Sequence, residues 1–337
     1  MNDDNLENRM RKMKKDVIER LEFEAKFSKE IPELITGDYT IRSGIYTLSH
    51  DIRVENGRLT IEKGTTLNFE KDKGVYIGTD YTWNTSRIMT LGTQQEPIIL
   101  QAKTATWNGI TIARTKEDNS IIYTTIRDAK KKEGGGIYSG YSKLYLKNTT
   151  LKNCQAESFG GIYFIFGELQ IDNSTIEKCT GGGLLNQDTE LNIDKTTIKN
   201  NYSGSGIYNA SSDVKITNSM ITENAHGGIS NSSANVKIEN TQIIGNTTPE
   251  CGGAGIHNSF GSVVTIENTR IMNNRIVLSD WTIQVNRKWP NLPKAHGGGV
   301  YNDKPEFSHT KRSQFIQIGK GNYIYNNKPD NIYEEND

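Results

Sequence analysis

The chain has 337 residues, and its 40 basic and 40 acidic side chains cancel to a formal net charge of zero. A neutral chain has no electrostatic drive toward nucleic acid, and no apolar run approaches the roughly 20 residues that a membrane-spanning helix needs. We therefore expect neither a nucleic-acid partner nor membrane insertion. Hydrophobic residues make up 34% of the chain, which is low for a globular enzyme of this length and fits a thin solenoid with a narrow core.

Residues 1–30 predict an amphipathic α-helix. Asp4 and Glu7 are spaced as a capping box at its start. Its apolar residues recur at helical spacing: Leu6, Met10, Met13, Val17 and Leu21. Two roles stay open for residues 4–28, because the segment could cap the first strands of the following domain or join copies of the chain in a homo-oligomer.

The beginning of the chain has no apolar stretch of the kind found in a secretory signal. We therefore expect a cytoplasmic protein, or one assembled into a particle, rather than export through a signal peptide. Three cysteines, an odd number, also argue against a disulfide-built extracellular scaffold.

From residue 134 onward, a glycine-rich phrase followed by a branched apolar residue recurs at uneven steps of 22 to 44 residues. The apolar anchors of this phrase are Ile137, Ile162, Leu184, Ile207, Ile229, Ile256 and Val300. A second column contains Leu146, Ile171, Ile193, Ile216, Ile238 and Ile266, and a third contains Leu151, Ile176, Ile198, Ile221, Ile243 and Ile271. Columns that stay in phase through an uneven period indicate one solenoid turn per repeat, with the length variation confined to one loop.

Each repeat alternates inward and outward residues and favours β-branched types, which predicts short strands rather than helices. The fold class we expect is all-β: a right-handed, single-stranded parallel β-helix with three strands per rung and about 22–25 residues per rung. This domain covers residues 31–330 and carries a long loop at 275–296. The N-terminal α-helix precedes it, and residues 331–337 form a C-terminal tail.

Asparagines form two further columns. One lies three residues after the third apolar column and contains Cys154, Cys179, Asn201, Asn224, Asn246 and Asn274. The other lies two residues after the first apolar column and contains Asn186, Asn209, Asn231, Asn258 and Asn302. Asparagine tolerates the left-handed conformation of a tight turn, and its amide can bond the next rung, so we expect structural ladders.

The repeats resemble those of right-handed parallel β-helix proteins of the pectin-lyase-like superfamily. Their glycine-rich and Ile-x-x-Asn phrases are also similar to those of polymorphic outer-membrane and adhesin-type β-helices. The N-terminal phrases at 59–69, 107–112 and 121–129 are typical of the first rungs of such proteins. The resemblance implies the fold but no single activity, because this superfamily includes lyases, hydrolases, epimerases, tailspikes and adhesins.

The first predicted strand of each rung points a tyrosine-rich column outward. Its aromatic members are Tyr138, Tyr163, Tyr208 and Tyr301. The long loop adds Trp281, Arg287 and Trp289, residue types that anchor partners. We interpret these seven residues as candidate binding residues for a glycan or a protein partner, because aromatic faces can pack against sugar rings.

The alternative candidate site is catalytic. His226, Glu250 and His296 lie at the corner before the first strand, and His257 lies on that strand. The tyrosine column contains no carboxylate, whereas glycoside hydrolysis normally uses two carboxylates. No superfamily catalytic motif matches this chain, so no catalytic residue is carried over.

The leading functional hypothesis is therefore a non-catalytic binding or structural β-helix that presents the tyrosine column and the loop to a glycan or protein. Two alternatives remain open: a polysaccharide lyase, hydrolase or epimerase that uses the histidine-rich corner, and a structural subunit of a phage or secretion particle. No cofactor motif and no metal-ligand spacing is present in the sequence.

Overall fold

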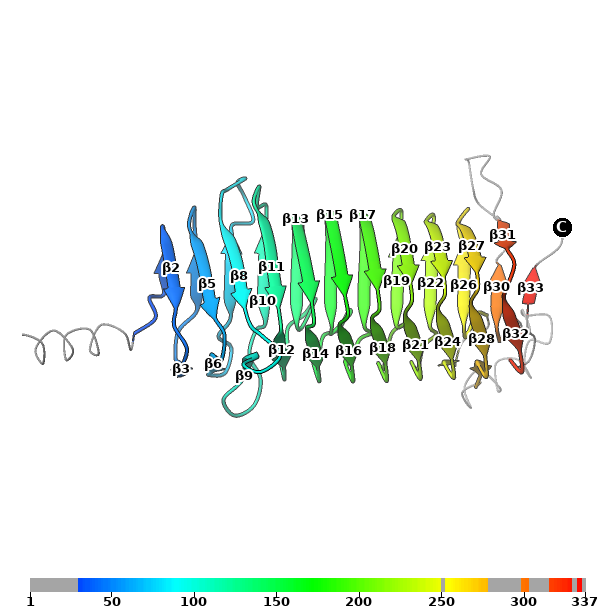
Figure 1. Cartoon of the computed structure of the whole chain (residues 1–337), viewed down its shortest axis with the longest axis horizontal. Helices are drawn as coiled ribbons and strands as arrows, with labels where there is room; N and C mark the ends of the chain where they lie inside the picture. Colours follow the sequence, from blue (N-terminus) through cyan, green and yellow to red (C-terminus); the bar gives the residue numbers. More distant parts are fainter. Residues whose placement is uncertain (1–29, 250–251, 278–297, 303–314, 329–331, 335–337) are drawn as a thin grey trace, which may run out of the picture. The chain divides into compact units, whose positions relative to one another are not determined.

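The computed structural model describes residues 30–249, 252–277, 298–302, 315–328 and 332–334 (Figure 1). The chain divides into two units, Met1–Glu33 and Leu34–Asp337. The helix expected over residues 4–28 and most of the loop at 275–296 lie outside the described residues. The described ranges contain no α-helix, and this part of the chain provides no helix long and apolar enough to span a bilayer.

The second unit is a stack of rungs, and each rung has three strand positions joined in parallel to the rungs before and after it. The first strands are β1 (Leu34–Ile35), β4 (Ile52–Val54), β7 (Val75–Gly78), β10 (Ile110–Ala113), β19 (Ile207–Ala210), β22 (Ile229–Ser232), β26 (Ile256–Ser259), β30 (Val300–Asn302) and β33 (Ile332–Glu334). The second strands are β2 (Asp38–Ile41), β5 (Arg58–Glu62), β8 (Arg87–Leu91), β11 (Asp118–Ile122), β20 (Asp213–Thr217), β23 (Asn235–Glu239), β27 (Val263–Glu267) and β31 (Phe315–Ile318).

The third strands form an 11-stranded sheet of their own. They are β3 (Ile45–Leu48), β6 (Thr66–Phe69), β9 (Ile98–Ala102), β12 (Thr124–Arg127), β14 (Thr150–Lys152), β16 (Thr175–Glu177), β18 (Thr197–Lys199), β21 (Met220–Thr222), β24 (Gln242–Ile244), β28 (Arg270–Met272) and β32 (Tyr323–Tyr325). Three long strands run through both the first and the second position: β13 (Ile137–Lys147), β15 (Ile162–Asp172) and β17 (Leu184–Asp194) (Figure 1). At a corner, β25 (Thr247–Thr248) pairs with β29 (Arg275–Ile276).

The predicted register is confirmed in all three apolar columns. Ile137 pairs with Ile162 in the first strands, and Leu151 pairs with Ile176 in the third strands. The second column follows the same order through β20, β23 and β27. Because these side chains are buried in the centre of each rung, a slip of one residue would move the whole column to the solvent side.

Glycine precedes the first-position strands from β7 to β30 because adjacent rungs approach closely there. A Cβ atom added to Gly161 would lie 2.2 Å from the carbonyl oxygen of Gly183 on the next rung. The corresponding distance from Gly183 to the Gly206 carbonyl is 2.4 Å. Any side chain would collide with backbone, which explains why the phrase recurs with glycine at this position.

The asparagine ladders are confirmed. The Asn224 side-chain amide donates to the Asn246 Oδ1 at 3.0 Å, and the Asn246 amide donates to Asn274 at 3.0 Å. In the second ladder the Asn209 amide donates to Asn231 at 2.9 Å. All of these side chains are buried, and in the first ladder the amides satisfy one another where water cannot reach. In the second ladder the Asn209 Oδ1 and the Asn258 amide nitrogen have no partner among the described residues.

One detail of the turn interpretation is wrong. The ladder asparagines do not adopt the left-handed conformation, which falls on the residue just before them: Asn200 has φ 54° and Asn273 has φ 58°. The ladder residue itself points inward, because its amide is needed for the bonds between rungs. Cys154 and Cys179 are free, buried thiols at the N-terminal end of this ladder, and the Cys179 backbone N–H donates to Asn201 Oδ1.

Candidate functional site

The tyrosine column of the first strands lies in the predicted register. Tyr138 pairs with Tyr163, which pairs with Leu185 and then Tyr208. Toward the N-terminus the column continues through Thr111, Tyr76 and Arg53, which lie on strands β10, β7 and β4. We call this outward surface the first-strand face.

Neighbouring side chains cover the ring faces of Tyr76 and Tyr138 and one face of the Tyr163 ring. Tyr138 and Tyr163 are stacked, with ring centroids 5.6 Å apart and an interplanar angle of 17°. The Lys131 Nζ lies 5.6 Å from the Tyr138 ring centroid and 5.5 Å from that of Tyr76, whose ring also has the Arg53 guanidinium at 4.8 Å. The column therefore presents ring edges and hydroxyls to solvent, while its faces hold the rungs together.

Burial sets the ionisation of this cluster. It lowers the pKa of Lys131, whose ammonium also donates a hydrogen bond to Thr111, and the nearby Asp80 and Glu133 partly oppose that effect. Burial likewise raises the pKa of Tyr138. The cluster is thus a packed cation–aromatic network rather than an open aromatic surface.

The remaining predicted site residues are only partly described. His257 lies against Tyr301 with ring centroids 5.4 Å apart, and Tyr301 is 6% exposed, so its ring is buried rather than presented to solvent as expected. His226 is half-buried at the corner before β22. Five candidates lie outside the described residues: Glu250, Trp281, Arg287, Trp289 and His296. Within the described part of the chain, no group of three or more His, Cys, Asp or Glu side chains is placed to hold a metal ion.

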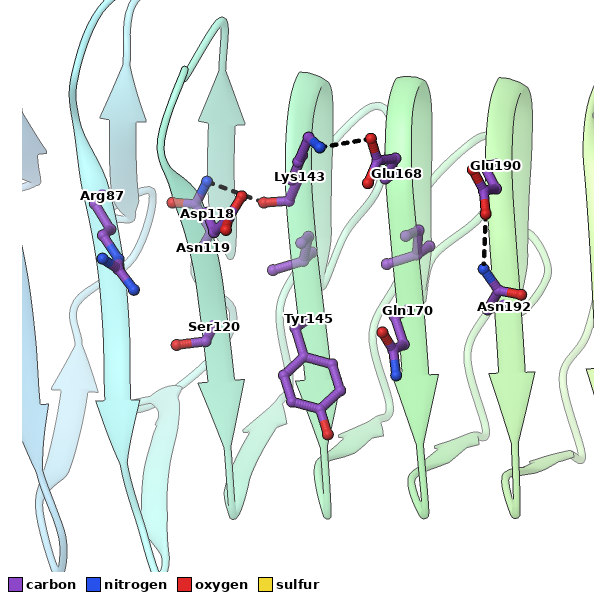
Figure 2. Close-up of a pocket in the computed structure, with 12 residues that line it drawn as sticks. Arg87, Asp118, Asn119, Ser120, Lys143, Tyr145, Glu168, Gln170, Glu190 and Asn192 are labelled. Atoms are coloured by element: carbon purple, nitrogen blue, oxygen red, sulfur yellow. Dashed lines mark hydrogen bonds and ion pairs between the residues drawn. The ribbon is translucent and has the colours of Figure 1, made fainter.

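A groove lies on the outward surface of the second strands (Figure 2). One hollow of about 400 Å³ begins at Arg87 on β8 and reaches Asn192 on β17. A second hollow of about 360 Å³ continues to Thr265 on β27. Both are lined by Glu190 and Asn192, so they form one continuous depression, which we call the second-strand groove.

One side of the groove is a column of charged residues. Lys143, Glu168, Glu190 and Asp213 occupy one register position on four consecutive rungs, about 4.8 Å from one strand to the next. Lys143 forms an ion pair with Glu168 at 2.6 Å. Glu190 accepts a hydrogen bond from Asn192 at 3.3 Å, and Asp213 accepts one from the Asn235 amide at 2.8 Å.

A second column lies two residues further along each strand. It contains Ser120, Tyr145, Gln170 and Asn192 in register. The Tyr145 hydroxyl donates to Asp172 at 2.9 Å, and the Gln170 amide donates to the same carboxylate at 3.1 Å. Burial, the hydrogen bond and the Asp172 charge raise the pKa of Tyr145 to about 12.

Tyr145 is the only aromatic residue among those that line the first hollow, and its ring is seen face-on beside Gln170 in Figure 2. Unlike Tyr138 and Tyr163, it is stacked on no other ring among the described residues. The buried side chains of Leu144 and Leu169 form the floor beneath it. The groove thus combines a fixed aromatic ring with hydrogen-bond donors and acceptors.

The groove was not predicted from the sequence, because only the first strands were considered as a binding face. The signal was present: Lys143, Glu168, Glu190 and Asp213 each lie three residues before the second apolar column, at Leu146, Ile171, Ile193 and Ile216. Period-2 alternation places that position on the outward side. Reading this outward position from repeat to repeat would have revealed the carboxylates.

The comparison with protein families agrees with the fold. The family model of the right-handed β-helix region matches residues 108–271 and 160–337. No curated protein matches the sequence. Similar solved structures include two variants of the periplasmic alginate epimerase AlgG. One is 12% identical, with 91% of this chain and 82% of that chain covered at a TM-score of 0.43. The other is 13% identical, with 91% and 79% covered at a TM-score of 0.39.

The A-module of the Azotobacter vinelandii mannuronan C-5 epimerase AlgE4 is also similar, at 12% identity and a TM-score of 0.30, with 87% of this chain and 91% of that chain covered. The family match extends over more than half of the sequence, including every rung from β10 to the last third strand. The chain therefore belongs to the right-handed β-helix family.

Proposed function

We propose that this protein is a non-catalytic β-helix that binds a glycan chain along the second-strand groove. The observation that supports the proposal is the continuous groove, which runs from Arg87 to Thr265 across successive rungs. An extended polymer lying along it would meet equivalent side chains about every 4.8 Å. Tyr145 would supply the ring on which one sugar packs.

The lining of the groove favours a glycan over a protein partner. A protein interface normally has an apolar centre with aromatic and arginine anchors and few charged residues. Here the walls consist of carboxylates, amides, lysines and hydroxyls, which suit the many hydroxyl groups of a sugar. The only aromatic wall residue of the first hollow is Tyr145. Binding would therefore depend on one ring and many hydrogen bonds.

A catalytic role for the same groove is the second candidate, and one observation supports it. Glu168, Glu190 and Asp213 lie on consecutive strands, so neighbouring carboxylates are spaced close to the roughly 5 Å used by retaining glycosidases. All three are exposed to solvent, whereas a catalytic acid is normally held in an apolar setting that keeps it protonated. Binding without turnover is therefore the function we favour.

The test is a glycan array followed by affinity measurements on the best ligand. Replacing Tyr145 by alanine should weaken binding about tenfold, equivalent to about 1.4 kcal/mol, because the sugar loses its stacking surface. The matched control is Tyr138→Ala, which removes a ring from the same strand on the first-strand face and should leave the affinity unchanged. Melting temperatures of both variants would separate lost contacts from lost stability.

The opposite pattern would contradict the proposal. If Tyr138→Ala abolished binding while Tyr145→Ala had no effect, the tyrosine column would be the binding surface instead. If the wild-type protein degraded the array ligand and Glu190→Gln stopped that reaction, the enzymatic candidate would replace the binding one. The same assays thus decide between the two faces and between binding and turnover.

A further inference from the structure

Arg87 lies at the β8 end of the second-strand groove, and its guanidinium forms no ion pair with the described residues. Its Nε–H is buried and has no hydrogen-bond acceptor in the described residues. The other cation of this hollow, Lys143, is paired with Glu168 at 2.6 Å. A buried donor without an acceptor is costly in folded proteins. The Arg87 side chain as a whole is half-buried and lines the hollow, so its terminal amino groups can bind an acceptor that arrives with a ligand.

The surroundings of Arg87 contain charges of both signs. Arg87 is in register with Arg58 on the neighbouring strand, and two like charges on adjacent strands repel each other. Arg58 is paired only loosely with Asp38, at 3.7 Å. Asp118 on the other side also lines the hollow, but no ion pair joins it to Arg87 among the described residues. The two arginines are balanced in number by Asp38 and Asp118, but Arg87 itself is held in no ion pair among the described residues.

A hydroxyl lies on the neighbouring strand, two residues further along than the position level with Arg87. Ser120 on β11 pairs with Met89 on β8 and lines the same hollow, and Figure 2 shows its oxygen directed toward β8. The Ser120 hydroxyl forms no hydrogen bond with the described residues. A planar anionic group between the two strands could accept hydrogen bonds from both side chains, the arginine supplying a charge-assisted pair.

From β15 to β20 the groove is lined by carboxylates. Glu168, Glu190 and Asp213 are consecutive in register, and only Glu168 has a lysine partner in its own column. A ligand with an acid on every sugar would place negative charges against these carboxylates. A ligand with one acid at its end would meet the arginine and keep neutral sugars over the carboxylates.

We infer that the β8 end of the groove is an anion subsite for the terminal carboxylate of a glycan whose other sugars are neutral, with Arg87 and Ser120 as its ligands. This inference rests on the proposed function of the groove. It fixes the direction of the bound chain, because the acidic terminus lies at Arg87 and the neutral sugars extend past Tyr145 toward β27.

The experiment compares three sets of array probes: neutral oligosaccharides, the same chains ending in glucuronic or sialic acid, and oligouronates. We expect the wild-type protein to prefer the acid-ended chains about tenfold over their neutral analogues, and to bind the oligouronates more weakly than the acid-ended chains. Arg87→Gln should remove the preference for the acid-ended chains. The control Arg127→Gln changes an arginine on the third strands and should preserve the preference for acid-ended chains.

Two results would overturn the inference while leaving the proposed function in place: an equal affinity for acid-ended and neutral chains, or a preference that survives in Arg87→Gln. If no probe bound, the proposed function would fail. The anion subsite would then be decided by the Arg87 Nε–H signal in NMR titrations with glucuronate and glucose. A shift with glucuronate alone would keep the subsite, and no shift would remove it.

Discussion

Replacement of Asn224 by leucine should lower the free energy of unfolding by roughly 4 kcal/mol, because it would leave several buried polar groups without partners. The Asn224 amide donates to Asn246 and to the Ile198 carbonyl, and its Oδ1 accepts from both the backbone and the side chain of Asn201. Leucine has nearly the same size, so the loss would come from the hydrogen bonds rather than from a cavity. Urea denaturation followed by circular dichroism measures it.

The control for this prediction is Asn218→Gly in the same rung. Asn218 is exposed, and its φ of 50° is a conformation that glycine adopts freely. Its amide bonds the exposed side of Asp194, so the change should stay within about 0.5 kcal/mol. If Asn224→Leu cost no more than this control, the ladder would contribute little and the stack would depend on its apolar columns alone.

The second large effect concerns the groove. Asn192 lines both hollows, so Asn192→Trp should fill the centre of the groove and reduce glycan affinity on the order of a hundredfold, about 2.8 kcal/mol. A large aromatic residue is well tolerated at an outward strand position, so the fold should remain intact. Isothermal titration with the best array ligand measures the loss.

Thr197→Trp is the matched control, because Thr197 lies in the same rung on the outward side of the third strands. It adds the same ring to a different face and should leave the affinity unchanged. Equal losses in the two variants would indicate a general disturbance of the rung. Unchanged binding in Asn192→Trp would show that no ligand occupies the groove.

The fold could be predicted from the sequence because its core consists of simple, repeated positions. Columns such as Ile137–Ile162 and Leu151–Ile176 contain one apolar residue per strand, and their spacing alone defines the register. The asparagine ladder was predictable for the same reason, since Asn224 and Asn246 hold equivalent positions. Because the repeats are regular, the buried positions of a solenoid can be predicted from its sequence.

The packing of the outward side chains was less predictable, for a physical reason. Alternation indicates which side chains point outward, but it does not indicate how they pack once rungs stack about 4.8 Å apart. At that spacing Tyr138 and Tyr163 stack on each other, and Lys131, from the preceding corner, covers Tyr138. The sequence therefore predicts an open aromatic binding surface, whereas in the structure these rings pack against one another and against Lys131.

The groove depends on a combination that no single repeat reveals. Lys143 and Glu168 neutralise each other on adjacent rungs, whereas Glu190 and Asp213 do not. Arg87 belongs to a rung outside the regular glycine-rich repeats, so its place at the end of the same column appears only when β8 and β11 are aligned. Sites in a solenoid arise where successive rungs differ, and the differences must be compared in three dimensions.

The central claim, that a glycan lies in the second-strand groove, is tested most directly by NMR on protein labelled with ¹³C at its tyrosine rings. Addition of the tightest array ligand should shift the Tyr145 ring signal, assigned by its loss in Tyr145→Phe, and should leave the signals of Tyr138 and Tyr163 unchanged. Shifts of Tyr138 and Tyr163 with an unmoved Tyr145 would contradict the claim and return the binding site to the first-strand face.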